Sequence, residues 1–167
     1  APDLMWYTSG YNNYTYANVE WFCQSDESYS GGSSAQSGTI PDNETGYTYL
    51  ETTINVSELK NIAFYWKIDA TTSSDYMTFS VNGDQRDNLY YYHYPEGEWQ
   101  VATTQLLPGS NTLRWQFTKN QNSDNSSAWV DNIVIADPYA LDLLAHYADT
   151  YKMPTIPQPL FVKNRVA

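Results

Sequence analysis

The 167-residue sequence contains a single cysteine, so no disulfide bond can form within the chain. It also has few basic residues: 8 lysines and arginines stand against 19 aspartates and glutamates, for a net charge of −11. Nucleic acids and anionic membranes are bound through clustered cations, so this balance argues against both as partners. No stretch approaches the roughly 20 apolar residues that a membrane-spanning helix needs. No membrane insertion is therefore expected.

The lone cysteine, Cys23, follows Trp21 and Phe22. This context predicts a buried, small apolar side chain and not a reactive thiol. The acidic balance suits the solubility of a secreted protein. We therefore expect an extracellular or cell-surface location, and the lack of disulfides favours a bacterial source.

Patterns for catalysis are missing as well. Retaining glycosidases place two carboxyl groups about 5 Å apart, usually on one strand face. The pattern Glu-x-Asp-x-Glu occurs nowhere, and Glu96 and Glu98 follow Pro95 in what reads as a turn. His93 and His146 have no nucleophile or metal-ligand spacing around them. The sequence predicts a protein that is not an enzyme.

What the sequence does contain is strand periodicity through most of its length. Residues 61–68 place four large apolar side chains on one face, and residues 75–81 alternate in the same way. The tripeptide Asn82-Gly83-Asp84 predicts a tight hairpin turn. Residues 25–37 are rich in serine and glycine and are predicted to be a loop too polar to pack. Further strands are expected at 4–8, 18–23, 47–56, 89–94, 99–106, 112–118 and 128–136.

Short strands punctuated by Pro-Gly and Asn-Gly predict an all-β, antiparallel two-sheet β-sandwich, a jelly roll, over residues 1–136. Residues 137–167 differ. Residues 139–151 have a helical period, and Pro154, Pro157 and Pro159 then impose an extended path. We expect a short C-terminal helix and a tail or linker toward a neighbouring domain, with the alternative that the tail packs back on the sandwich.

Several short sequence pieces occur in a characteristic order between residues 32 and 135. The pieces are residues 34–38, 64–67, 74–83, 98–99, 107–115, 118–120 and 128–133. In this order they resemble a bacterial extracellular module with a MAM-like or concanavalin A-like jelly-roll fold, similar to carbohydrate-binding modules. The resemblance implies the fold more strongly than the function.

Jelly-roll binding modules often hold one structural Ca²⁺ between the N-terminal and last strands. Glu20 and Asp131 stand where such ligands would lie, and Ca²⁺ prefers carboxylate and carbonyl oxygens. An acid among apolar strand residues is costly unless it is paired. Two alternatives remain: a structural Ca²⁺ held by these acids, or an Asp131 that accepts hydrogen bonds from Lys67, Lys119 or backbone amides.

A run of aromatic residues, 89–94, is the strongest candidate for ligand binding. On a strand, alternate rings share a face at about 6.6–7 Å intervals, and sugar rings stack their C–H faces on aromatic planes. The alternative is that one face is core and the other a solvated tyrosine ladder. The predicted ligand-binding residues are Tyr90, Tyr91, Tyr92, Tyr94, Trp99 and Arg86.

Together these features predict a non-catalytic carbohydrate-binding module that binds a polysaccharide or oligosaccharide through surface aromatics. It would be tethered to other domains of a secreted polysaccharide-active protein. The alternative is an adhesion or interdomain protein-binding module of a bacterial cell-surface protein, with tyrosines as interface anchors.

Overall fold

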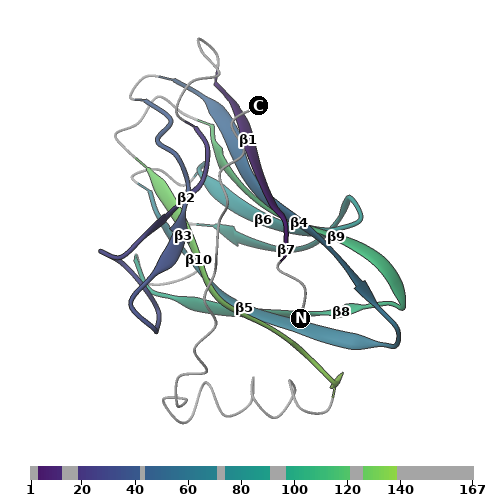
Figure 1. Ribbon diagram of the computed structural model, residues 1–167. Helices are drawn as coiled ribbons and strands as arrows, with labels where there is room; N and C mark the ends of the chain where they lie inside the picture. The colour runs from purple at the N-terminus through teal and green to yellow at the C-terminus, as the bar shows by residue number, and fades with distance from the viewer. Residues whose placement is uncertain are drawn as a thin grey trace.

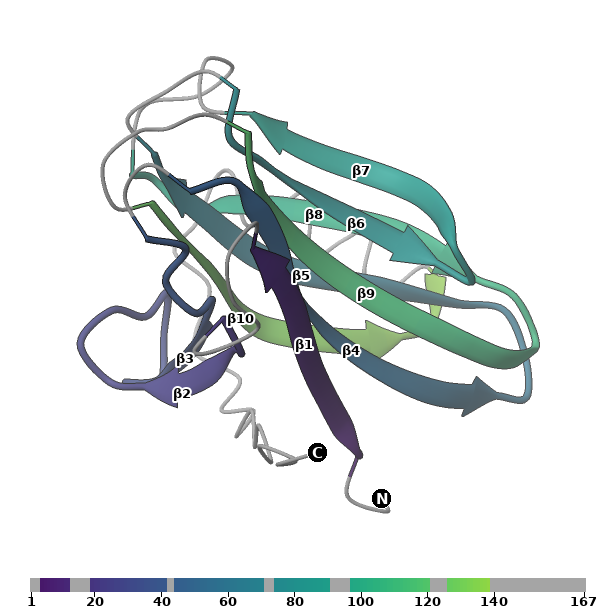
Figure 2. The ribbon, with the colours of Figure 1, turned by 90° about the horizontal axis from the view of Figure 1, so that it is seen from above.

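The computed structural model describes residues 4–12, 19–41, 44–70, 74–90, 97–120 and 126–138. These residues form two five-stranded antiparallel sheets packed face to face, which confirms the predicted β-sandwich (Figures 1 and 2). The predicted helix at 139–151 and the tail lie outside the described residues. Sheet A has the order β1 (Trp6–Asn12), β4 (Gly46–Val56), β9 (Gly109–Lys119), β6 (Tyr76–Val81), β7 (Asp84–Tyr90). Sheet B has the order β2 (Phe22–Gln24), β3 (Ser34–Gln36), β10 (Ser127–Ala136), β5 (Lys60–Asp69), β8 (Gln100–Leu106).

The core lies between the sheets, and the alternation seen in the sequence puts it there. Strands β4, β5, β6 and β9 alternate between buried and less buried residues. Trp115 of β9 is fully buried, with its ring 6.0 Å from Trp6, 5.3 Å from Phe64 and 4.9 Å from Phe79. The side chains next to these on each strand point outward, so each sheet has one core face and one outer face.

The predicted hairpin turn joins β6 to β7. Asn82 and Gly83 both have positive φ, 54° and 85°, as the turn type that suits strand twist requires. Asn82 is also tied to the next strand, since its N–H donates to Thr112 O and its side-chain oxygen accepts from Thr112 N–H, both at 2.8 Å. The turn is therefore held beside β9 at the end of sheet A.

Two local predictions were wrong. Segment 25–37 contains strand β3, and Ser34 and Ser37 are buried because their hydroxyls are hydrogen-bonded, to Glu27 O and Ala128 N–H respectively. Cys23 is exposed, because β2 is a short edge strand and Trp21 takes the core position instead.

Candidate ligand-binding face

The outer face of sheet A carries side chains aligned in register across its five strands. Neighbouring strands lie about 4.8 Å apart, so each row extends roughly 19 Å across the sheet. From β1 to β7, the first row is Tyr11, Tyr47, Thr118, Tyr76 and Tyr90, the second is Ser9, Tyr49, Gln116, Thr78 and Asn88, and the third is Tyr7, Glu51, Arg114, Ser80 and Gln85.

The first row, called the tyrosine row below, consists of two aromatic pairs. The rings of Tyr11 and Tyr47 are 6.2 Å apart, and those of Tyr76 and Tyr90 are 5.3 Å apart. Thr118 separates the pairs, and β4 and β6 on either side of it are about 10 Å apart. Two aromatic surfaces thus flank a small polar side chain.

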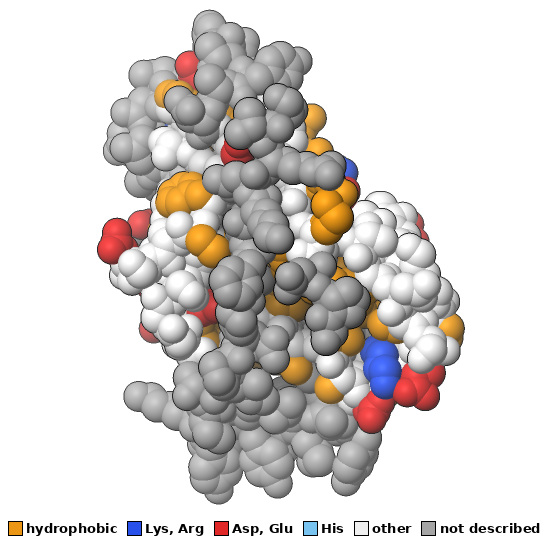
Figure 3. All heavy atoms as spheres, viewed as in Figure 1, with side chains coloured by type: hydrophobic (Ala, Val, Ile, Leu, Met, Phe, Trp, Pro, Cys, Tyr) orange, Lys and Arg blue, Asp and Glu red, His pale blue; other side chains and the backbone are white. Residues whose placement is uncertain are grey.

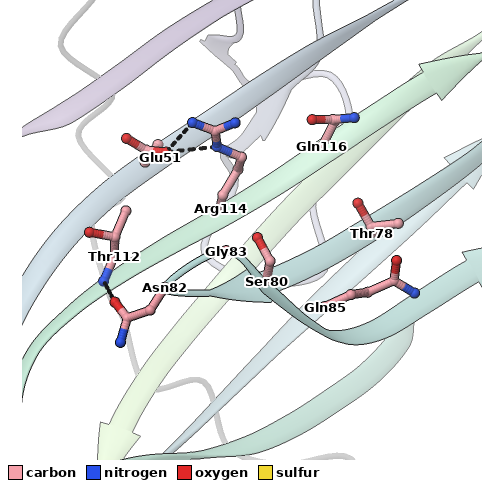
Figure 4. Close-up of a pocket in the computed structure, with 9 residues that line it drawn as sticks. All are labelled: Glu51, Thr78, Ser80, Asn82, Gly83, Gln85, Thr112, Arg114 and Gln116. Carbon is pink, nitrogen blue, oxygen red and sulfur yellow. Dashed lines mark hydrogen bonds and ion pairs between the residues drawn. The ribbon is translucent and has the colours of Figure 1, made fainter.

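A pocket of about 560 Å³ lies on the same face (Figure 4). It is beside the tyrosine row, because its lining residues Thr78 and Gln116 belong to the second row. Arg114 is fixed in its wall: Nε and Nη2 both donate to Glu51 Oε2 at 2.7 Å, and the guanidinium lies 4.0 Å from the Tyr49 ring centre. A lining of hydroxyls, amides and one ion pair offers hydrogen bonds in both directions. The polar pocket is lined by Glu51, Thr78, Ser80, Asn82, Gly83, Gln85, Thr112, Arg114 and Gln116.

Part of the outer face of sheet B is covered by residues 24–33, called the cover loop below. The ring of Tyr29 stacks on Tyr65 of β5, 3.5 Å away and within 10° of parallel. Gln24 holds the loop's shape, since its side-chain oxygen accepts from the N–H groups of Asp26 and Glu27 at 2.7 and 2.9 Å. Beneath it, outward-facing Trp129 is only 8% exposed. Within the described part of the chain, sheet A therefore presents the less covered face.

The predicted ligand-binding residues fall on different parts of the molecule. Tyr90 belongs to the tyrosine row, and Arg86 lies on β7 outside the pocket lining, with Asp84 4.0 Å away. Trp99 lies on the sheet B side, where its ring is 6.3 Å from that of Tyr29 and its Nε1–H donates to Glu27 at 3.3 Å. The structure therefore does not bring Tyr90 and Trp99 to one surface. Tyr91, Tyr92 and Tyr94 lie outside the described residues.

Sequence reasoning missed most of the residues on this face. Tyr47, Tyr49 and Tyr76 occupy alternate positions on strands that were predicted, opposite the core-facing residues. This alternate spacing indicates that the three rings face away from the core. It does not show that β4 and β6 are both neighbours of β9, and this strand order is what places the rings on one surface.

Asp131 is 3% exposed and anchors the cover loop. Its Oδ2 accepts from Tyr29 N–H at 2.9 Å and Ser30 N–H at 3.1 Å, and its Oδ1 accepts from Asn132 N–H at 2.7 Å. Burial raises the pKa of the Asp131 carboxyl, and these backbone N–H groups oppose the rise.

These contacts bear on the proposed calcium ion. N–H groups face the Asp131 oxygens, whereas a cation needs oxygen ligands there, and Glu20 is exposed. Within the described part of the chain, no three His, Cys, Asp or Glu side chains form a metal-binding group. The donor set fits the second alternative, an acid paired with backbone amides. The calcium site itself stays a prediction.

Changing Asp131 to alanine should lower the free energy of unfolding by on the order of 3 kcal/mol, because three N–H groups lose their acceptor. If Asp131 is paired with backbone amides alone, the wild-type melting temperature is the same in excess chelator as in calcium, and Glu20→Ala has little effect. Calorimetric melts of the three proteins measure this. A wild-type drop on chelation that either variant removes would instead establish a shared calcium ion.

Charge is spread thinly over the surface. On the face seen in Figure 3, acidic side chains are scattered and basic ones are few. Among the described side chains on that face, no basic patch of the kind that binds phosphate is visible. Among the described residues there is no helix with the length and hydropathy to span a bilayer.

No protein-family model matches the sequence, and no curated protein matches it either. Solved structures do match. The carbohydrate-binding module TmCBM61, solved with β-1,4-galactotriose, has a TM-score of 0.53 at 9% identity, covering 79% of this chain and 88% of that one. The C-terminal family 22 carbohydrate-binding module of Clostridium thermocellum Xyn10B has a TM-score of 0.51 at 12% identity, covering 80% and 86%.

The secreted serine protease VesC from Vibrio cholerae also matches, with a TM-score of 0.50 at 16% identity. Here 72% of this chain corresponds to only 25% of the protease chain. The structural neighbours thus include carbohydrate-binding modules of the β-sandwich superfamily, as the sequence resemblance implied. At these identities the likeness concerns the fold.

Proposed function

We propose that the chain is a non-catalytic carbohydrate-binding module and that it binds a glycan on the outer face of sheet A. The observation that carries this proposal is the placement of a polar pocket of about 560 Å³ beside a row of four tyrosines on one face. Tyrosine rings offer planes on which sugar C–H faces stack. The pocket's hydroxyls and amides match a ligand rich in hydroxyl groups.

Exposure of the rings supports the same face. Tyr7, Tyr11 and Tyr47 are 38%, 37% and 40% exposed. A gathered aromatic surface is costly to leave in water unless it is used. Tyr90 belongs to this site, and Tyr91, Tyr92 and Tyr94 continue the chain from it, so they stay part of the proposal.

The context we propose is a secreted, bacterial, polysaccharide-active protein in which this module is tethered to other domains. The structural neighbours support this context. One of them is a module of Xyn10B, and this chain matches only a quarter of the chain of the secreted protease VesC. In that setting the module would keep its parent protein near an extracellular polysaccharide. It would carry out no reaction of its own.

The test is electrophoresis of the purified chain in native gels that contain soluble plant or algal polysaccharides. We expect retardation by at least one glycan, and Tyr90→Ala should weaken it about 5-fold or more, the loss of one stacked ring by analogy with nucleobases. Phe22→Ala is the control, because it also removes a solvent-exposed ring, 38% exposed, but from sheet B. Indifference to every glycan, with capture of a protein partner, would favour the adhesion or interdomain alternative.

A further inference from the structure

The polar pocket carries very little charge of its own. On the outward positions of the three central strands of sheet A, the only Asp, Glu, Lys and Arg residues described are Glu51 and Arg114. These two are paired, with both contacts at 2.7 Å (Figure 4). The two charges therefore cancel at the wall where a ligand would lie.

The pair is held in place from a second side. The Arg114 guanidinium lies over the ring of Tyr49, 4.0 Å from its centre. A planar guanidinium that is stacked on one face and hydrogen-bonded at its edge has little freedom to turn toward another anion. Its other N–H groups still point away from Glu51 and can donate to a ligand (Figure 4).

This arrangement discriminates between ligands by charge. A carboxylated sugar could accept from the remaining guanidinium N–H groups, but it would lose hydration beside a cation that Glu51 already neutralises, and it would approach a protein of net charge −11. A cationic amino sugar would likewise lose hydration beside a carboxylate that Arg114 already neutralises. An uncharged hydroxyl can accept from the remaining guanidinium N–H groups without breaking the pair.

We infer that the polar pocket takes a segment of an uncharged polysaccharide, and that the Glu51–Arg114 pair is what rejects charged sugars. This inference rests on the proposed function and goes beyond it by naming the ligand class and the residues that select it.

The experiment compares one glycan in two forms: a neutral polysaccharide retained in the gels, and the same material oxidised at its primary alcohols to uronate. We expect the wild-type chain to bind the uronate form about tenfold or more weakly than the neutral form in titration calorimetry. Binding of the neutral form should be the same at low and high salt, because no ligand charge is involved.

Glu51→Gln keeps the shape of the side chain but leaves Arg114 as an uncompensated cation. In this variant the ratio between the affinities for the neutral and uronate forms should fall about tenfold. Added salt should weaken the variant's binding of the uronate form. Glu58→Gln is the matched control, because it makes the same charge change on an exposed residue outside the pocket lining. Its affinity ratio between the neutral and uronate forms should equal that of the wild type.

Equal or tighter wild-type binding of the uronate form would overturn the inference while leaving glycan binding intact. The inference would also be overturned if Glu58→Gln lowered the affinity ratio as much as Glu51→Gln does. The net charge of the protein, and not the Glu51–Arg114 pair, would then determine the preference for the neutral form. Binding of charged glycans alone would likewise overturn the inference, whereas failure of the wild type to bind any glycan, neutral or charged, would overturn the proposed function itself. The wild-type comparison needs no variant, so it decides the ligand class even if Glu51→Gln folds poorly.

Discussion

Removing Tyr47 and Tyr76 together is expected to abolish most of the glycan affinity of this chain. The two side chains lie in one row on either side of Thr118, each at the inner edge of a tyrosine pair. Ring stacking contributes about 1–3 kcal/mol per residue for nucleobases, so by analogy the double alanine variant should bind about 30-fold or more weakly. Titration of the glycan selected in gels measures the loss.

The fold should survive this change, because both side chains face away from the core. The melting temperature of the double variant verifies that. The control is again Phe22→Ala, which removes a ring about as exposed as that of Tyr47 but from the other sheet, and it should bind as the parent does. Wild-type affinity in a folded Tyr47/Tyr76 double variant would falsify the placement of the ligand on the tyrosine row.

Replacing Trp115 with alanine should have the largest effect on stability. The ring lies at the centre of the core and contacts Trp6, Phe64 and Phe79, so its removal leaves a large cavity between the sheets. Such truncations cost about 3–5 kcal/mol, a large part of the 5–15 kcal/mol by which domains are stable. We expect the melting temperature to fall by roughly 6–20 °C.

Gln116→Ala provides the control for this measurement. Gln116 is the next residue on β9, but its side chain faces outward, so its truncation should change the free energy of unfolding by less than about 0.5 kcal/mol. Chemical denaturation of both variants gives the comparison. A Trp115→Ala protein as stable as the Gln116→Ala protein would show that the core does not depend on this ring.

Alternation in the sequence separates the two faces of a strand in sheet A. In residues 75–81 it sets Met77, Phe79 and Val81 apart from Tyr76 and Thr78, and these two groups are the core and outer faces of β6. A strand repeats every two residues whatever its neighbours are, so the pattern can be read locally. The hairpin turn at Asn82-Gly83 can also be predicted from the sequence, because a turn with positive φ at two successive residues favours this residue pair.

The packing of residues 25–37 cannot be predicted from their local pattern. The serines of this segment indicate a loop too polar to pack, yet Ser34 is buried because the Glu27 carbonyl, 7 residues earlier in the sequence, accepts from its hydroxyl. Asp131 likewise meets Tyr29 across 102 positions of sequence. Hydrogen bonds of this kind satisfy buried polar groups, and the local sequence pattern does not indicate which residue the partner will be.

By itself, the sequence determined that this chain forms an antiparallel two-sheet sandwich, because strand periodicity and turn chemistry are local properties. It also determined that clustered cations are scarce. Only the tertiary structure decided which outward residues share a surface. The order β1-β4-β9-β6-β7 brings Tyr11, Tyr47, Tyr76 and Tyr90 into one row, and it separates Tyr90 from Trp99, which is only 9 positions away in sequence but packs against the other sheet. The order of strands in a sheet depends on how all the strands together bury the core. A binding face made of residues far apart in sequence therefore exists only once the sheets have formed.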